Sequence, residues 1–289
     1  MNKLAEILKL MRLKQWIKNG FVAIPFILSL KFLEINFQNY FNLFLGILSF
    51  YLISSAVYII NDLIDRKEDR QHNKKKNRPL AKGSISVSLA LIICAFLIFS
   101  SFWIVVYFFN IKALLVILLY FLNSLIYSFK TKNFAIFDTM SIALGFVLRV
   151  LFGIFCFETP ISKWVILLTF TICLFLAFTK RRKDFNDGYV RKSLRGYTQI
   201  MLDKFIIISA VLAISCYVMY TNEMVNISGN YGFTFTNIFV IFGVFRYLQA
   251  LHLDTSDIGD SGIIIYKDMV FLGNIILWGM TLILCLISS

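Results

Sequence analysis

Long apolar runs separated by short polar stretches dominate the chain. Each run is about as long as a helix that crosses a bilayer, which needs about 20 residues. The runs are dense in Phe, Ile and Leu and lack the strict alternation of a membrane barrel strand. The pattern predicts an all-α polytopic membrane protein, a single domain over residues 1–289. About nine transmembrane helices are expected, at 18–34, 40–61, 86–109, 111–128, 136–156, 162–180, 203–221, 235–252 and 268–287.

Residues 2–17 follow a different pattern. Apolar Leu4, Leu8 and Met11 alternate with basic Lys3 and Lys9. A helix with an apolar face and a basic face lies in the plane of the membrane surface. We therefore expect an interfacial amphipathic helix over 2–17.

Composition agrees with this class of protein. Of the 289 residues, 59% are hydrophobic and only 16% are charged, with a mean hydropathy of +0.77. An average soluble domain is about 45–50% apolar and about 25% charged, so a water-soluble enzyme and a disordered chain are both excluded. The five cysteines lie in apolar stretches without a C-x-x-C pair, and there are two histidines. A disulfide framework, a zinc site and a histidine metal cluster are therefore not expected.

The net charge of +13 predicts an orientation rather than binding to nucleic acid. With the N-terminus in the cytoplasm and nine alternating spans, 25 of the 29 Lys and Arg residues fall on the cytoplasmic side and three outside. This bias matches the positive-inside rule. It predicts a multi-pass protein of the cell inner (plasma) membrane with its C-terminus outside. Every Asp falls on or near the same cytoplasmic face, which indicates a polar site there.

The segment 62–85 is the strongest candidate for a catalytic cytoplasmic loop. If the second span continues as a helix past Asn61, Asp62, Asp65 and Asp69 lie on one face. Oxygen ligands without His or Cys favour Mg²⁺, bound together with substrate phosphates. The basic run that follows supplies donors for phosphate oxygens. The alternative is an ordinary solvated loop.

A second polar pattern lies on the predicted helix 136–156. Asp138 and Arg149 are eleven residues apart on one face, about 16 Å along the axis. A charge at the depth of Arg149 is costly and marks a functional site unless it has a structural partner. The stripe predicts a polar cavity that enters the bundle from the cytoplasm. Lys180 and Arg181 end a later span, where they either bind phosphate or only set topology.

These motifs resemble the UbiA superfamily of intramembrane prenyltransferases. Asn61-Asp62-x-x-Asp65-x-x-x-Asp69 corresponds to its first Asp-rich motif, whereas Ile142 stands four residues after Asp138, where a second D-x-x-x-D motif would need an acid. The chain is most similar to the decaprenyl-phosphate phosphoribosyltransferase branch. The matching blocks are Arg12-x-x-Gln15-Trp16-x-Lys18-Asn19, Asp69-Arg70-x-His72-x-x-Lys75-x-x-Arg78-Pro79-x-Ala81-x-Gly83, Tyr127-Ser128 with Lys132, Gly145-Phe146-x-Leu148-Arg149, Lys180-Arg181, Arg191-x-Ser193-Leu194-x-x-Tyr197 and Phe245-Arg246-Tyr247.

The resemblance implies a Mg²⁺-dependent transfer of 5-phosphoribose from soluble 5-phosphoribosyl 1-diphosphate to a polyprenyl phosphate in the bilayer, with cell wall biosynthesis as one destination of the product. It implies catalytic roles for Asp62, Asp65, Asp69 and Asp138, and a metal site of Asn61, Asp62, Asp65 and Asp69. Asp138 is a candidate to position the ribose hydroxyls. Substrate contacts are expected from Lys18, Asn19, His72, Lys75, Arg78, Tyr127, Lys132, Arg149, Lys180 and Arg181.

Two other functions compete with this one. A UbiA-type prenyltransferase would move a prenyl group from a prenyl diphosphate to an aromatic or other lipophilic acceptor, and the missing second motif and the extra bases argue against it. A transporter would carry ionisable residues near mid-membrane in several spans, but Arg149 is the one deep Lys or Arg of the predicted spans. The oligomeric state stays open, with a homo-oligomer among the alternatives.

Overall fold

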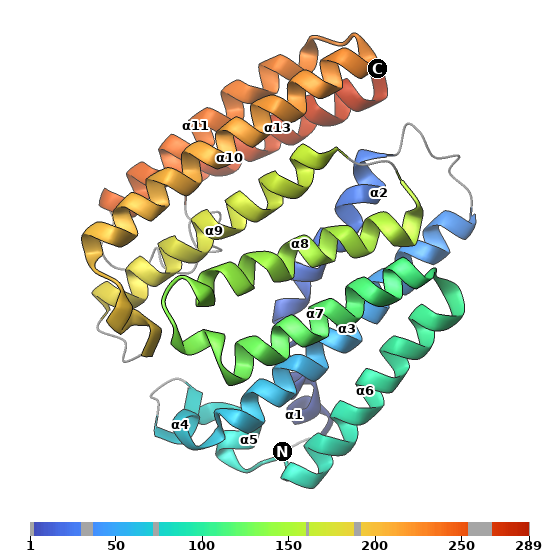
Figure 1. Ribbon diagram of the computed structural model, residues 1–289, viewed down its shortest axis with the longest axis vertical. Helices are drawn as coiled ribbons and strands as arrows, with labels where there is room; N and C mark the ends of the chain where they lie inside the picture. The colour runs from blue at the N-terminus through green and yellow to red at the C-terminus, as the bar shows by residue number, and fades with distance from the viewer. Residues whose placement is uncertain are drawn as a thin grey trace. The chain divides into compact units, whose positions relative to one another are not determined.

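The described part of the chain folds into helices (Figure 1). The computed structural model describes residues 3–29, 37–71, 75–159, 162–187, 192–253 and 268–288. Every regular element in these ranges is helical, which confirms the all-α prediction. The elements are α1 (Lys3–Leu10), η1 (Leu13–Ala23), α2 (Ile24–Leu28), α3 (Phe37–Ile64), α4 (Arg66–Gln71), η2 (Lys75–Asn77), α5 (Pro79–Lys82), α6 (Val87–Phe108), α7 (Ile111–Phe129), η3 (Thr131–Asn133), α8 (Phe137–Phe157), α9 (Lys163–Asn186), η4 (Lys192–Gly196), α10 (Gln199–Ser228), α11 (Gly232–Leu253) and α13 (Met269–Ser288).

Within the described ranges, eight helices are long and apolar enough to cross a membrane. They are α3, α6, α7, α8, α9, α10, α11 and α13, and they coincide with eight of the nine predicted segments. Polar side chains define several of their first turns: Ser86, Asn110 and Thr198 each accept a hydrogen bond from a backbone N–H of the first turn. Such caps satisfy amides that a helix leaves unpaired at its start.

The first predicted segment, 18–34, is not one long helix in its described part. Residues 13–23 form the 3₁₀-helix η1, α2 ends at Leu28, and residues 30–36 lie outside the described ranges. Pro25 explains the break, because it lacks an N–H and its ring clashes with the preceding helical turn. Pro25 instead stands in the first turn of α2, where proline is favoured.

Residues 11–28 nevertheless run antiparallel to α3 along most of its length. The Trp16 ring stacks on Tyr51 at 4.5 Å, and Phe26 packs against Tyr40 near the start of α3. At the other end, Arg12 meets Asp62. The 22 residues of α3 between these two ends rise about 33 Å, roughly the thickness of the hydrocarbon core. The ninth helix is therefore not confirmed, but the segment spans a comparable depth.

The interfacial helix predicted over 2–17 is shorter than expected. Its helical part, α1, ends at Leu10, and Arg12 then takes a left-handed conformation at φ 55°. Leu10 is fully buried, whereas Leu4 and Leu8 stay exposed. The 3₁₀ turns of η1 replace the predicted second half of the helix.

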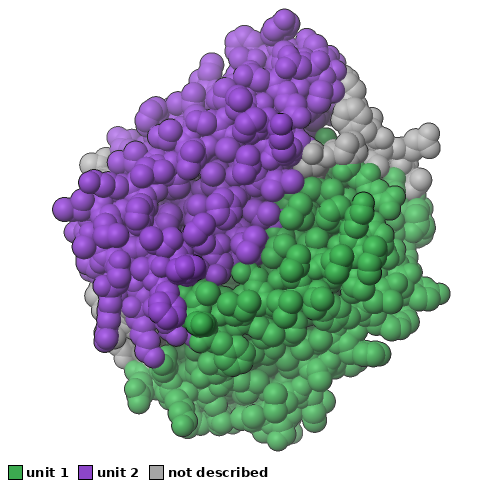
Figure 2. Space-filling model, viewed as in Figure 1, with its two compact units in different colours: residues 1–29, 33–131, 148–160 green, residues 30–32, 132–147, 161–289 purple. Residues whose placement is uncertain are grey.

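The helices group into two compact units (Figure 2). In the described chain, unit 1 holds the elements from α1 to α7 and the end of α8 from Leu148, while unit 2 holds the first half of α8 and the elements from α9 to α13. Unit 1 packs its core around Phe50, Ile117 and Phe152, and unit 2 around Phe175, Leu202 and Tyr247. The single-domain prediction stays a prediction.

Candidate active site

The Asp-rich motif lies where α3 passes into α4. The amide of Asp65 bonds to the carbonyl of Asn61 at 2.9 Å, and that of Asp69 to the carbonyl of Asp65 at 2.8 Å. These i to i−4 bonds carry the helical path past the end of α3, as predicted, and hold Asp62, Asp65 and Asp69 on one face. Asp62 and Asp69 are buried, each 2% exposed, so their negative charges require nearby cations.

Arginine side chains supply these cations. Arg78 Nη1 donates to Asp62 Oδ1 at 3.0 Å and to Asp69 Oδ2 at 2.7 Å. Arg12 Nη2 makes a second ion pair with Asp62 Oδ1, and its guanidinium lies 5.1 Å from the centre of the Tyr58 ring. Since one nitrogen of Arg78 touches both carboxylates, the two oxygens converge on a single cation position.

The segment from α4 to α5 fixes Arg78 in this position. Arg66 Nε donates to the carbonyl of Leu80 and Arg70 Nε to that of Ala81, both at 3.1 Å. Pro79 begins α5 directly after Arg78, and its fixed φ suits a helix start. Gly83 ends α5 at φ 80°, a backbone conformation that glycine adopts without a Cβ penalty.

The donor set suits Mg²⁺. Carboxylate and amide oxygens are the protein ligands that this ion takes, and Asn61 Nδ2 bonds to Asp65 Oδ2 at 3.1 Å beside the converging pair. Among the residues that the structure describes, no three His, Cys, Asp or Glu side chains form a ready-made metal site. The position between Asp62 and Asp69 is held by the Arg78 guanidinium instead, so the residues fit a cation there.

Arg149 lies in the apolar core of unit 1 and is 5% exposed. Its Nε donates to Asn19 Oδ1 at 3.0 Å and its Nη2 to the Tyr120 hydroxyl at 2.9 Å. The guanidinium also lies 4.7 Å from the centre of the Tyr120 ring, a cation–π distance. Asn19 in turn donates to Ser54 Oγ at 2.9 Å. Structural partners therefore account for at least part of the stabilisation of this deep charge.

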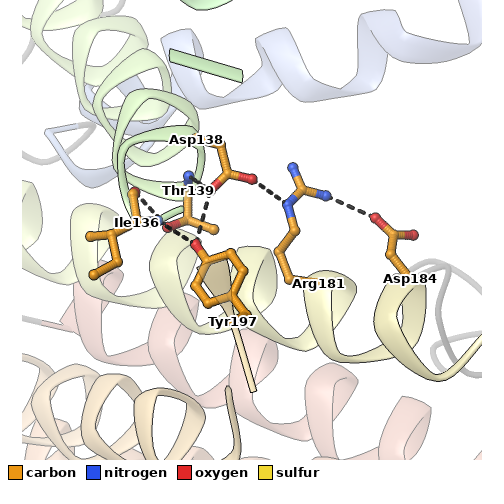
Figure 3. A network of polar contacts seen from close by, with 6 residues as sticks. All are labelled: Ile136, Asp138, Thr139, Arg181, Asp184 and Tyr197. Atoms are coloured by element: carbon orange, nitrogen blue, oxygen red, sulfur yellow. Dashed lines mark hydrogen bonds and ion pairs between the residues drawn. The ribbon is translucent and has the colours of Figure 1, made fainter. Parts of the chain in front are cut away.

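A second buried ion pair lies in unit 2, at the start of α8 (Figure 3). Arg181 Nε donates to Asp138 Oδ2 at 2.6 Å, and Arg181 Nη1 donates to Asp184 Oδ2 at 2.9 Å. The Tyr197 hydroxyl donates to Asp138 Oδ1 at 2.9 Å and accepts a bond from the amide of Ile136, whose φ is 67°. Burial raises the pKa of Tyr197 to about 12, so its hydroxyl stays a donor at neutral pH.

The remaining predicted residues differ in their exposure to solvent. Lys18, Lys75 and Lys180 are exposed, and Tyr127 and Lys132 are half-buried. His72 lies outside the described residues. The structure thus unites Asp62, Asp69 and Arg78 in unit 1, Asn19 and Arg149 in the core of that unit, and Asp138 and Arg181 in unit 2.

Sequence reasoning did not assign Arg12, Asp184 and Tyr197 to the site. Arg12 is 50 positions from Asp62, and Tyr197 is 59 positions from Asp138. No local spacing predicts contacts at this separation. For Arg12 and Tyr197, the signal in the sequence was that both belong to the matching motif blocks. For Asp184, the signal was its spacing of three residues from Arg181, which places the two side chains on one helix face.

Three comparisons place the chain among known proteins. It is 27% identical over 93% of its length to a decaprenyl-phosphate phosphoribosyltransferase of Mycobacterium tuberculosis, covering 90% of that relative. It is 26% identical over 93% of its length to a decaprenyl-phosphate phosphoribosyltransferase of Mycolicibacterium smegmatis, of which it covers 88%. The fold matches a UbiA homologue of Archaeoglobus fulgidus bound to DMAPP and Mg²⁺, with a TM-score of 0.73 and 16% identity over 98% of this chain and 99% of that one.

A family comparison covers most of the chain. Residues 22–261 match the UbiA prenyltransferase family, a range that contains the Asp-rich motif, Arg78, Asp138 and Arg181. The helical architecture, the eight long apolar helices and this match agree with one another. The protein is therefore a multi-pass membrane transferase that belongs to the UbiA prenyltransferase family.

Proposed function

We propose that the protein transfers 5-phosphoribose from 5-phosphoribosyl 1-diphosphate to a polyprenyl phosphate. The observation that carries the proposal is the union of two buried carboxylates with two arginines at the end of α3. Such a cluster holds ligands for a metal and donors for phosphate oxygens in one place. Similarity over nearly the whole chain to phosphoribosyltransferases supports ribose, rather than a prenyl group, as the transferred unit.

The reaction joins two phosphate-bearing substrates. An oxygen of the acceptor phosphate forms a bond to the anomeric carbon of the ribose, and the bond from that carbon to diphosphate breaks. Diphosphate departs with the bonding electron pair, and the product is polyprenyl-phosphoryl-5-phosphoribose. The attacking oxygen is already anionic, so no general base is needed.

The side chains of unit 1 have separate roles in this proposal. Asp62 and Asp69, with Asp65 and Asn61, would hold Mg²⁺, which supplies positive charge to the departing diphosphate. Arg12 and Arg78 neutralise the buried carboxylates before substrate arrives, and a guanidinium has five N–H donors with which to bind phosphate oxygens as well. These charges are positioned in advance by α5 and η1, which lowers the cost of reorganisation during the reaction.

A transfer assay tests the proposal. Membranes that contain the protein are incubated with ribose-labelled 5-phosphoribosyl 1-diphosphate, polyprenyl phosphate and Mg²⁺, and label is counted in the organic phase. We expect transfer that stops with EDTA and returns with Mg²⁺. Transfer from a prenyl diphosphate to an aromatic acid, without any transfer of ribose, would refute the proposal in favour of a prenyltransferase.

Asp62→Asn and Asp69→Asn test the assigned residues. We expect either change to lower the rate by at least about a hundredfold, because loss of electrostatic stabilisation of this kind costs about 2.7–4 kcal/mol. Glu68→Gln is the matched control, since Glu68 neighbours Asp69 but is exposed. Full activity in both aspartate variants, or equal loss in the control, would show that the metal site lies elsewhere.

The proposed orientation puts the N-terminus and the active site in the cytoplasm and the C-terminus outside, in the inner membrane. Eight spanning helices, together with a crossing by residues 13–28, would place the two termini on opposite sides. A C-terminal alkaline phosphatase fusion, active only outside the cytoplasm, is expected to be active. An inactive phosphatase with a fluorescent C-terminal GFP fusion would contradict this orientation.

A further inference from the structure

A groove in unit 1 lies beside the Asp-rich motif but on a different face of the same helical segment. It has a cavity volume of about 440 Å³, within the range of sites that bind small molecules. Its basic lining residues are Arg66, Lys67 and Arg70, and its apolar ones include Ile64, Val87 and Leu91. Among the residues that the structure describes, no acidic side chain contributes to this lining.

Helix periodicity explains why the groove is separate from the candidate active site. At 100° per residue, Arg66, Lys67 and Arg70 are centred about a third of a turn away from Asp62, Asp65 and Asp69. Asp62 and Asp69 pair with Arg12 or Arg78, whereas the basic residues line the groove next to the start of α6. One helical segment therefore presents an acidic face and a basic face.

Two of the three bases are held in place. Arg66 and Arg70 are four residues apart, and each uses Nε to bond a backbone carbonyl of α5, Leu80 or Ala81, at 3.1 Å. An Nε bond fixes the plane of a guanidinium, and the fork of its terminal nitrogens suits phosphate geometry. Lys67 is exposed and adds a mobile ammonium. The arrangement is complementary to a phosphate anion.

The apolar residues identify the kind of phosphate compound. Ile64 is the last residue of the spanning helix α3, and Val87 is the first residue of α6. Ile64 and Leu91 are 38% and 53% exposed. Both belong to helices that are apolar and long enough to cross a membrane, so a lipid would place its headgroup on the bases and its acyl chain along Ile64 and Leu91. Basic pockets between helix ends are suited to anionic lipid headgroups.

We propose that this groove binds an anionic phospholipid of the surrounding bilayer. The headgroup phosphate lies on Arg66, Lys67 and Arg70, and an acyl chain runs along α3 and α6. Because Arg66 and Arg70 also hold the carbonyls that follow Arg78, the bound lipid stabilises α5 and with it the position of Arg78. The site requires neither the sugar donor nor Mg²⁺, so it stands apart from the proposed transfer reaction.

Native mass spectrometry of the full-length protein in detergent tests the proposal. The protein is titrated with phosphatidylglycerol and with phosphatidylcholine of the same chain length. The variant combines Arg66→Gln, Lys67→Gln and Arg70→Gln. The matched control removes three bases outside the groove lining, by Lys76→Gln, Lys130→Gln and Lys192→Gln, all at exposed positions.

We expect the natural protein to bind phosphatidylglycerol at least about tenfold more tightly than phosphatidylcholine. Each Lys or Arg near an anionic headgroup increases the binding affinity about fivefold. The groove variant should lose the preference, and the control should keep it. An unchanged preference in the groove variant, or equal loss in the control, would overturn the proposal. If the triple variant does not fold, Lys67→Gln alone should weaken the binding of phosphatidylglycerol about fivefold. An unchanged affinity in this variant would count against the site.

Two further titrations distinguish the source of the phosphate. Leu91→Ser is expected to weaken phosphatidylglycerol binding, and millimolar inorganic phosphate is expected not to displace the lipid. Displacement by inorganic phosphate would indicate a site for a soluble anion and would overturn the proposal. Displacement by an equimolar amount of polyprenyl phosphate would assign the groove to that lipid instead, which also overturns it.

Discussion

The ion pair of Asp138 with Arg181 allows a quantitative test of how unit 2 is stabilised. Asp138 is 0% exposed and Arg181 is 2% exposed. Removing one partner of a pair this deeply buried leaves an uncompensated charge and costs about 3–5 kcal/mol. Asp138→Asn keeps an oxygen that accepts from Tyr197, and Arg181 keeps its bond to Asp184. We therefore expect a loss near the lower limit, about 3 kcal/mol.

Thermal unfolding in detergent measures this loss. A change of 1 kcal/mol shifts Tm by about 2–4 °C for a chain of 150–250 residues, so Asp138→Asn should lower Tm by about 6–12 °C. The double variant Asp138→Asn with Arg181→Met removes both charges and should recover most of the loss, because a pair without charges avoids the desolvation cost. Asp203→Asn is the control: its partnership with Arg182 is partly exposed and contributes about 1 kcal/mol or less.

The expected pattern can fail in two ways. A fall in Tm of less than about 2 °C for Asp138→Asn would mean that the pair is hydrated rather than buried. A double variant less stable than Asp138→Asn would mean that Arg181 stabilises the fold through other contacts. Either result would refute the claim that a desolvated charge pair determines the stability of this cluster.

Three further predictions concern single side chains. Tyr197→Phe should lower the free energy of unfolding by about 1–3 kcal/mol, because it leaves a backbone amide without its acceptor. The pKa of Tyr197 is raised to about 12 in the folded protein, so the stability that its hydroxyl contributes should be complete below pH 10 and decline as pH rises toward 12. Curves of Tm against pH for the natural protein and the variant measure this decline. A hydrogen bond from Ser84, and to a lesser degree one from Lys9, lowers the pKa of Glu6 below its ordinary 4.5. The natural protein should therefore be more stable than Glu6→Gln above pH 4.5, and this difference in Tm should shrink as pH falls below 4.5. A difference in Tm that does not change with pH would contradict this. Gly153→Ala should lower the free energy of unfolding by about 1–3 kcal/mol, because the new Cβ would lie 2.2 Å from the carbonyl oxygen of Val22. Gly279→Ala is the control: nothing lies within 4 Å of its new Cβ, so it should not lower Tm.

The apolar pattern was sufficient to predict most of the fold. Runs of about 20 apolar residues have one stable solution in a bilayer, a helix that satisfies its own backbone bonds. Eight predicted segments are therefore helices in the structure. At 18–34 the pattern did not reveal that the described residues divide into 3₁₀ and α pieces, because that division depends on Pro25 and on packing against α3.

The candidate site was predicted in part for a similar reason. The spacing of Asp62, Asp65 and Asp69 already places them on one helix face, since helical periodicity is a local property. The neutralisation of Asp62 by Arg12 and Arg78 depends on contacts across 50 and 16 positions. No periodicity along the chain specifies such contacts.

The sequence by itself therefore determined the class of protein, the helices and the face on which the acids lie, because these follow from hydrophobicity and from local backbone geometry. Only the tertiary structure decided which base neutralises which acid. It joined Asp138 to Arg181 and Tyr197, and Arg149 to Asn19 and Tyr120. The physical reason is that burying a charge is costly unless a partner is brought to it, and the choice of partner depends on how distant helices pack.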